Sequence, residues 1–205
     1  MEGDRAETRI QKRNREAILE GALDVFSARG FRGATLDEIA AAAGLSKPNL
    51  LYYFPSKEAI HRSLIEGLLD DWLAPLKAID SAGEPVDEIV GYVLRKLEMS
   101  RTMPRESRLF ANEMLQGAPH IANTISGRLK ALVAEQAALL DRWIAAGRLA
   151  PLDPKHLIFS IWATTQHYAD FEVQVAAILG GTENARFAEA RAFLEAFYRQ
   201  ALAPR

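Results

Sequence analysis

The sequence contains no cysteine among its 205 residues, so disulfide bonds, thiolate nucleophiles and cysteine metal ligands are excluded. The N-terminal stretch MEGDRAETRIQKRNRE is polar and lacks the apolar segment of a signal peptide. No apolar run approaches the roughly 18–20 residues that are needed to span a bilayer. We therefore expect a protein of the cytoplasm that has no membrane partner.

Motifs that carry catalysis are missing as well. The sequence has no phosphate-binding loop, no glycine-rich nucleotide loop and no G-x-S-x-G segment around a serine. Its four histidines show no spacing typical of metal ligands, and each is expected to be a surface or capping residue: His61, His120, His156 and His167. The sequence predicts no enzyme, no metal site and no cofactor.

What the chain does contain is typical of a helical protein. Hydrophobic residues make up 49% of it and charged residues 25%, which is enough for a core and ordinary for a soluble protein. No segment shows sustained period-two alternation of β-branched residues. The composition therefore predicts an all-α fold.

The net charge of −2 does not suggest a nucleic-acid partner, but the positive charges are unevenly placed. Residues 8–15 hold four cations and no acid: Arg9, Lys12, Arg13 and Arg15. A basic arm of this kind can lie along a phosphate backbone. The alternative is a solvated, disordered terminus.

Three short helices are predicted before residue 56. The first runs from about residue 11 to 29, where Gly30 ends it. Thr35 and Glu38 form a capping box at the start of the second, which ends at Gly44. Ser46 caps the third, with Pro48 in its first turn. Two short helices joined by a tight turn have the layout of a helix-turn-helix.

Longer helices follow, giving about nine helices in all. They are expected at residues 56–76, 86–101, 105–116, 121–146, 154–179 and from 182 onward. Pro75 is expected to kink or end the first of them. The natural boundary separates a helix-turn-helix domain with its basic arm, residues 1–56, from a larger helical domain for effector binding and dimerisation, residues 57–205.

Periodicity divides the third short helix into two faces. Leu50 and Phe54 point inward, and the outer face is polar and aromatic. Asn49 can pair with a base edge and Lys47 can reach a guanine or a phosphate. Other side chains, and the free NH groups at the starts of helices, can contact phosphate oxygens. The predicted DNA contacts are Thr35, Ser46, Lys47, Pro48, Asn49, Tyr52, Tyr53 and Lys57. The alternative is a small bundle whose tyrosines cover the core.

The segment TLDEIAAAAGLSKPNLLYYFPSKEAI resembles the DNA-binding domain of the TetR family of bacterial repressors. The family pattern ends in Leu-Tyr-x-Tyr/His-Phe-x-x-Lys, and this sequence reads LLYYFPSK from Leu50 to Lys57. The resemblance implies binding to double-stranded operator DNA. Leu51 replaces the usual tyrosine, so one common phosphate contact is either absent or made by Tyr52.

The later helices resemble the pyrimidine-responsive members of this family. The segments that carry the resemblance are DDWLAPLKA, SRLFANEMLQGAP and LAPLDPKHLIFSIWATTQHYADF. The resemblance implies that uracil or thymine is the effector and that its binding releases the DNA. It also implies control of genes for pyrimidine use.

The residues of the last segment are compatible with a nucleobase site. Trp162, Thr165 and Gln166 share one helical face. A carboxamide offers one donor and one acceptor to the edge of uracil. The expected effector contacts also include apolar residues from other helices, giving the set Trp72, Phe110, Met114, Trp162, Thr165 and Gln166. The alternative for Gln166 is a buried amide bonded to the backbone, and for the aromatic residues and Met114 plain core packing.

A dimer is expected because one reading helix covers only half of an operator. Two such helices must lie about 34–36 Å apart. The predicted two-fold seam carries Ile158, Ile161, Phe193 and Phe197. The effector would favour a state in which the two reading helices no longer match this spacing.

Two other functions without catalysis remain open at this point. One is an architectural DNA binder that needs no effector, although Thr165 and Gln166 would then have no role. The other is a TetR-type regulator that responds to a different aromatic or lipid-like molecule.

Overall fold

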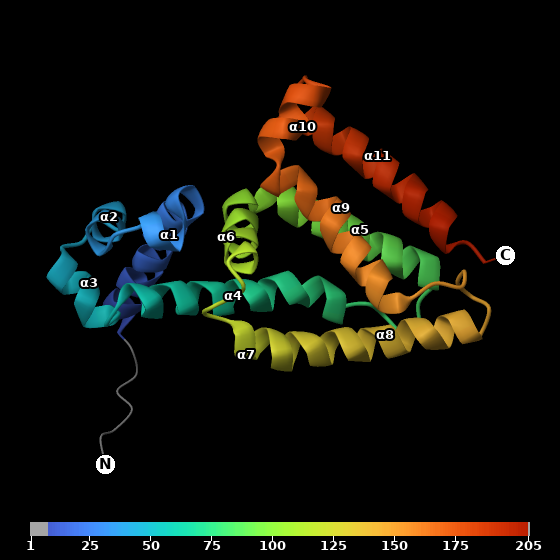
Figure 1. The fold of residues 1–205 in the computed structure, drawn as a ribbon, viewed down its shortest axis with the longest axis horizontal. Coiled ribbons are helices and arrows are strands. Elements are labelled where there is room, and N and C mark those ends of the chain that lie inside the picture. Colours follow the sequence, from blue (N-terminus) through green and yellow to red (C-terminus); the bar gives the residue numbers. More distant parts are fainter. Residues whose placement is uncertain (1–7, 205) are drawn as a thin grey trace, which may run out of the picture. The chain divides into compact units, whose positions relative to one another are not determined.

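A computed structural model of the protein describes residues 8–204, and all of its regular elements are helical (Figure 1). No strand occurs among these residues, which confirms the predicted all-α class. The elements are α1 (Arg9–Gly33), α2 (Leu36–Ala42), α3 (Lys47–Tyr53), α4 (Lys57–Lys77), α5 (Pro85–Thr102), α6 (Pro104–Leu115), α7 (Ala122–Thr124), the π-helical segment η1 (Ile125–Leu129), α8 (Lys130–Ala145), α9 (Pro154–Asp170), α10 (Glu172–Leu179) and α11 (Glu183–Leu202).

Two compact units make up the chain. The first consists of the residues up to Leu69 together with Arg108–Ile121, and the second of Asp70–Ser107 together with the residues from Ala122 onward. This division concerns packing, and the functional division after residue 56 stays a prediction. None of the helices in the described part of the chain has both the length and the apolarity to cross a lipid bilayer.

The first unit is built around α1, which packs against α2, while α2 in turn packs against α3. Ile18, Ala22 and Phe26 recur at helical spacing on α1 and are fully buried. Gly30 adopts φ 67° and ψ 172°, a conformation that favours glycine, so the regular helix is interrupted where the sequence predicts its end. The last residues of α1 therefore lead directly into α2.

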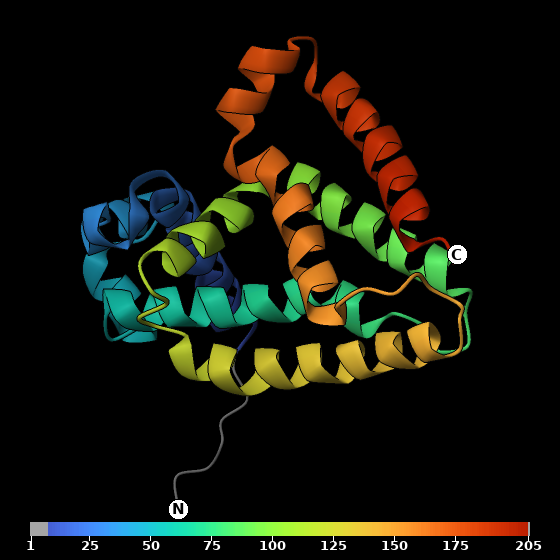
Figure 2. The same ribbon diagram turned by 45° about the vertical axis from the view of Figure 1, so that its right-hand side comes forward.

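In the second unit α5 contacts both α9 and α11, and α9 also contacts α8. Figure 2 shows α10 at the corner between α9 and α11. The buried face of α5 carries Ile89, Val93 and Leu97, as expected for a helix with neighbours on two sides. One charged side chain, Lys96, lies on this same face.

Two of the predicted long helices are interrupted. The helix expected over residues 154–179 breaks at Phe171, where φ is −116° and ψ is 31°. The helix expected over residues 121–146 contains the π-helical turn η1. Neither interruption coincides with a proline. In contrast, α4 ends at Lys77, close to Pro75 as predicted.

Candidate functional site

Local sequence signals position the helix-turn-helix. The Thr35 hydroxyl accepts from the Glu38 backbone NH, and the Glu38 carboxylate accepts from the Thr35 NH, which forms the predicted capping box. Gly44 takes φ 67° in the turn that follows α2, a left-handed conformation that glycine adopts at little cost. The Ser46 hydroxyl then caps α3 by accepting from the Asn49 NH.

The short helix α3 has one buried and one exposed face, as predicted. Leu50 of α3 and Phe54, the residue directly after α3, are buried in the first unit, as is Ile39 of α2. The exposed residues are Ser46, Lys47, Pro48, Asn49, Leu51 and Tyr52. Tyr52 is 71% exposed, which is unusual for a large aromatic side chain with no ligand to contact. This polar and aromatic surface, the reading face, is free to meet another molecule.

Polar contacts from α1 hold the two tyrosines. The Asn14 amide donates to the Tyr53 hydroxyl at 2.9 Å, and the Gln11 amide donates to the Tyr52 hydroxyl at 3.4 Å. The two rings pack edge to face, with centroids 5.1 Å apart. The tyrosines are therefore oriented before any DNA is bound.

The predicted basic segment, residues 8–15, is helical and not disordered, and its contact with a phosphate backbone stays a prediction. Thr8 caps α1, and Arg9 to Arg15 form the first turns of this helix. The physical reason is a second capping box, in which the Thr8 hydroxyl accepts from the Gln11 NH. Residues 1–7 of the predicted N-terminal domain lie outside the described residues.

Two predicted phosphate contacts have partners within the chain. The Lys57 ammonium donates to the carbonyl oxygens of Phe31 and Ala34, each at 2.8 Å. The Thr35 hydroxyl belongs to the capping box. Lys47 forms an exposed ion pair with Asp37 at 2.9 Å, a pair that contributes little and exchanges readily for a phosphate. The contacts of these residues with DNA stay predictions.

A buried polar cluster lies in the second unit, between helices α4, α5 and α9. The Trp162 indole NH donates to the Tyr92 hydroxyl at 2.6 Å. Lys96 follows Tyr92 by four residues on α5. Its ammonium lies 4.1 Å from the centroid of the Trp72 ring, in a cation–π contact. Tyr92 and Lys96 share one helical face, so this polar cluster contains both tryptophans predicted to contact the effector.

Lys96 is the most unusual member of the polar cluster. It is 0% exposed, and its ammonium has no hydrogen-bond partner among the described residues. Burial lowers the pKa of this amine to about 7, although the charge of Asp170 opposes the shift. The indole NH of Trp72 is also buried without a described partner. Two buried donors are thus left without an acceptor, which is rare in folded proteins.

The other residues predicted to contact the effector are divided between the two units. Thr165 is fully buried, but its hydroxyl donates to the Ile161 carbonyl at 2.7 Å, so it needs no further partner. Gln166 is partly buried on the same helix. Phe110 and Met114 are partly buried residues of the first unit. The structure thus brings together Trp72 and Trp162, within the polar cluster.

Sequence reasoning missed Lys96 and Tyr92. A signal was present, because both fall at helical spacing among the apolar residues Ile89, Val93 and Leu97. A lysine in the middle of an apolar stripe is rarely buried without a function or a partner.

A pocket of about 280 Å³ opens in the second unit beside Trp162. Its wall is mainly apolar but includes two lysines. The lining residues are Ile125, Leu129, Lys130, Val133, Ala134, Lys155, Phe159 and Trp162. The volume is close to the lower end of known small-molecule sites.

A third group of polar residues lies in the first unit and contradicts the prediction for His61. This side chain is 2% exposed and is therefore not a surface residue. Its ring approaches the carboxylate of Glu113, which also accepts from the backbone NH of His120 at 2.8 Å. Glu113 and His120 lie 52 and 59 positions after His61, so no local spacing could reveal the group.

Comparison with known proteins agrees with this arrangement. Residues 18–64 match the family described as bacterial regulatory proteins, tetR family, and residues 65–205 match the YcdC-like protein C-terminal region. RutR of Escherichia coli K12, an HTH-type transcriptional regulator, is 53% identical over 175 residues, which cover 85% of this chain and 82% of RutR.

Solved structures show the same fold. The ketosteroid transcriptional regulator KstR2 of Mycobacterium tuberculosis superposes with a TM-score of 0.72 at 24% identity, covering 93% of this chain and 95% of KstR2. GusR of Salmonella enterica gives 0.65 at 21% identity, covering 95% and 97%. RutR and KstR2 are both named as transcriptional regulators. From both family matches and the identity with RutR, the chain belongs to the TetR family of bacterial transcriptional regulators.

Proposed function

We propose that this regulator is a homodimeric repressor, that it reads operator DNA with the exposed face of α3, and that uracil or thymine releases it. The genes it controls would serve pyrimidine utilisation. The observation that carries the effector proposal is the pair of buried donors without acceptors, on Lys96 and Trp72. The sequence resemblance of the later helices to the pyrimidine-responsive members of the family supports the same effector.

The chemistry of the two donors selects a class of effector. A buried ammonium and a buried indole NH are satisfied by a ligand that brings carbonyl oxygens. Uracil and thymine carry two carbonyl groups on a flat ring, and flat rings stack well on indole. Gln166, partly buried on α9, would pair with the remaining edge of the ring. A ligand of hydrocarbon alone would leave both donors unpaired.

The reading face supports the DNA half of the proposal. Lys47 and Asn49 are exposed and suit base edges, and Tyr52 and Tyr53, which accept hydrogen bonds from α1, would contact phosphates. The cations of α1 add to the attraction for the backbone, since Arg9, Lys12 and Arg13 are exposed.

The proposed dimer seam needs a correction. Ile158 and Ile161 are each 1% exposed within a single chain, so they belong to the core of the second unit and not to a seam. Phe193 and Phe197 of α11 are 61% and 48% exposed, and their rings stack with centroids 5.8 Å apart. We propose that these two phenylalanines pack against a second copy of the chain, because an exposed aromatic pair is a common interface feature.

A different effector is the second candidate. It is favoured by the pocket of about 280 Å³ whose wall is mainly apolar. An aromatic or lipid-like molecule would fit this lining better than a nucleobase would. In that case the Lys96 cluster would play no part in the response.

A panel of nucleobases tested by thermal unfolding distinguishes the two candidates. We expect uracil or thymine to raise the melting temperature of the protein, because a ligand that binds only the folded state stabilises it by mass action. The expected rise is about 5–10 °C at about 100 times the Kd. Cytosine and adenine, which carry fewer carbonyl groups, should have smaller effects.

Substitutions test which site responds. Lys96→Met and Gln166→Ala should each remove the rise with uracil, whereas Val133→Ala in the apolar pocket should leave it unchanged. A rise that persists in Lys96→Met but disappears in Val133→Ala would assign the effector to the apolar pocket. No rise at millimolar uracil or thymine would contradict the pyrimidine proposal.

A further inference from the structure

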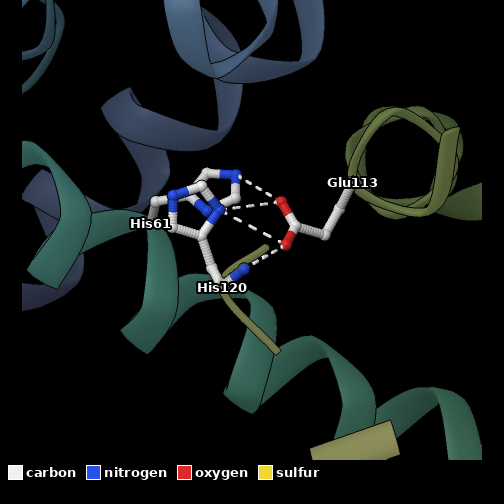
Figure 3. A group of neighbouring side chains, drawn as sticks. All are labelled: His61, Glu113 and His120. Atoms are coloured by element: carbon white, nitrogen blue, oxygen red, sulfur yellow. Dashed lines mark hydrogen bonds and ion pairs between the residues drawn. The ribbon is translucent and has the colours of Figure 1, made fainter. Parts of the chain in front are cut away.

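His61, Glu113 and His120 form a compact group in the first unit (Figure 3). His61 comes from α4, Glu113 from α6 and His120 from the segment that follows α6. The Nδ1 atom of His120 lies 3.0 Å from Oε2 of Glu113, and the Nε2 atom of His61 lies 3.9 Å from the same oxygen. One nitrogen or oxygen atom from each residue lies within 4.8 Å of the others.

These separations suit a shared metal ion. In a tetrahedral zinc site, nitrogen and oxygen ligands lie about 2.0–2.2 Å from the ion and so about 3.3–3.6 Å from one another. The distances of 3.0 and 3.9 Å lie on either side of this range. Small rotations of the side chains would bring all three atoms onto one ion.

Burial makes the group poorly satisfied without an ion. Glu113 is 3% exposed, and its carboxylate accepts only from the backbone and ring of His120 in the contacts described. His61 approaches the same carboxylate through its Nε2 atom. The 3.9 Å between its Nε2 and the carboxylate is too long for a hydrogen bond.

The protonation state of His61 also suits a metal ligand. Burial lowers the pKa of this imidazole to about 4, even though the Glu113 carboxylate opposes the shift. A neutral imidazole can donate a lone pair to an ion. A doubly charged ion would in turn compensate the buried carboxylate.

The donor set selects the class of metal. Two imidazoles and one carboxylate suit Zn²⁺ and neighbouring transition metals, whereas Mg²⁺ and Ca²⁺ prefer oxygen ligands alone. Three protein ligands leave a further position for water or a fourth group. His120 is 15% exposed, so the group can be reached from solvent.

The surroundings of the group connect it to the helix-turn-helix. The Phe31 ring, in the segment between the Gly30 kink and α2, lies 4.9 Å from the His61 ring and 4.4 Å from the His120 ring, by centroids. The Phe31 carbonyl accepts from Lys57 at the start of α4. An ion at this group would therefore fix the end of α1 against the parts of α4 and α6 that belong to the first unit.

We propose that His61, Glu113 and His120 bind a divalent transition-metal ion of the Zn²⁺ class, which stabilises the unit that carries the reading face. This site does not depend on the proposed effector, because no residue of the Lys96 cluster belongs to it.

The direct test is titration of metal-freed full-length protein with Zn²⁺ in competition with a chromophoric chelator. We expect one tight equivalent per chain. Thermal unfolding should shift upward by about 5–10 °C at a hundredfold excess over the Kd, with no comparable shift from Mg²⁺. Co²⁺ in place of Zn²⁺ should give the visible absorption of a four-coordinate site.

Three variants and one control decide whether this site is responsible. Glu113→Gln, His120→Asn and His61→Phe should each weaken Zn²⁺ binding at least tenfold, while the control His156→Ala, His167→Ala should bind as the unaltered protein does. Circular dichroism of each metal-free variant establishes that it is folded, and the partly exposed His120 gives the safest variant. The proposal would be overturned if the unaltered protein bound no tight equivalent of Zn²⁺. It would also be overturned if Glu113→Gln and His120→Asn bound Zn²⁺ as tightly as the unaltered protein does.

Discussion

Replacing Lys47 and Asn49 together by alanine is expected to weaken specific operator binding by at least about 100-fold. Each well-placed contact with a base edge contributes about 1–3 kcal/mol to discrimination, and a dimer loses both copies. Both residues are exposed on the reading face, and neither contributes to the buried core. Fluorescence anisotropy with a labelled duplex, obtained by selection from a random pool, measures the loss.

A matched control separates loss of recognition from loss of charge. Lys77→Ala, Asn184→Ala removes one lysine and one asparagine from exposed positions outside α3. This control should bind the selected duplex with nearly unchanged affinity. Both proteins should melt close to the unaltered one, since surface substitutions of this kind change stability little. If the Lys47, Asn49 variant keeps its affinity and its sequence preference, α3 does not read the operator.

The second large effect concerns stability and pH. Lys96→Met should make the protein more stable at pH 7 by roughly 3–5 kcal/mol, because it removes an amine whose charge is unfavourable in the fold. Lys96 is 0% exposed, with a pKa of about 7 against an ordinary value of 10.5. Methionine has a similar shape and no charge, so packing against Trp72 is largely kept.

The pH dependence follows from the direction of this pKa shift. Between pH 7 and about 10.5 the unfolded chain holds a proton on Lys96 more often than the folded chain does, so stability rises with pH. Below this window both states are charged and the penalty is complete, and above it both are neutral. From pH 7 to 9 the unaltered protein should gain roughly 2 kcal/mol that Lys96→Met does not gain.

Urea unfolding at pH 7, 8 and 9 measures this difference. His61 titrates at lower pH, since its pKa is lowered to about 4 in the fold and is near 6.5 in the unfolded chain, so it does not contribute within this window. Lys155→Met, at an exposed position, serves as the control and should follow the unaltered protein. Parallel stability curves for Lys96→Met and the unaltered protein would show that the buried amine is not destabilising.

The parts of the fold that the sequence predicted correctly depend on local interactions. The capping box of Thr35 and Glu38, the glycine turn at Gly44 and the cap at Ser46 each involve residues within a few positions of one another. Such signals determine where a helix begins and ends whatever packs against it. The reading face of α3 followed from the same information, because helical periodicity alone places Leu50 inside.

The parts that were missed depend on distant contacts. The partners of His61 are 52 and 59 positions away. Lys96 contacts the ring of Trp72, which belongs to another helix. No glycine or proline stands at the helix break at Phe171, so the sequence gives no signal for it. The preceding residue, Asp170, accepts a hydrogen bond from the distant Ser107. Periodicity identifies a buried face but not what buries it, which is why Ile158 and Ile161 were assigned to a seam.

In the proposed function one molecule both reads DNA through α3 and releases it when the effector binds. The most direct test is the affinity of the unaltered protein for its selected duplex, measured over a salt series with and without millimolar uracil or thymine. We predict an affinity that falls steeply with salt and is lowered by the nucleobase by about 5–150-fold. An affinity that responds neither to salt nor to the nucleobase would contradict the account.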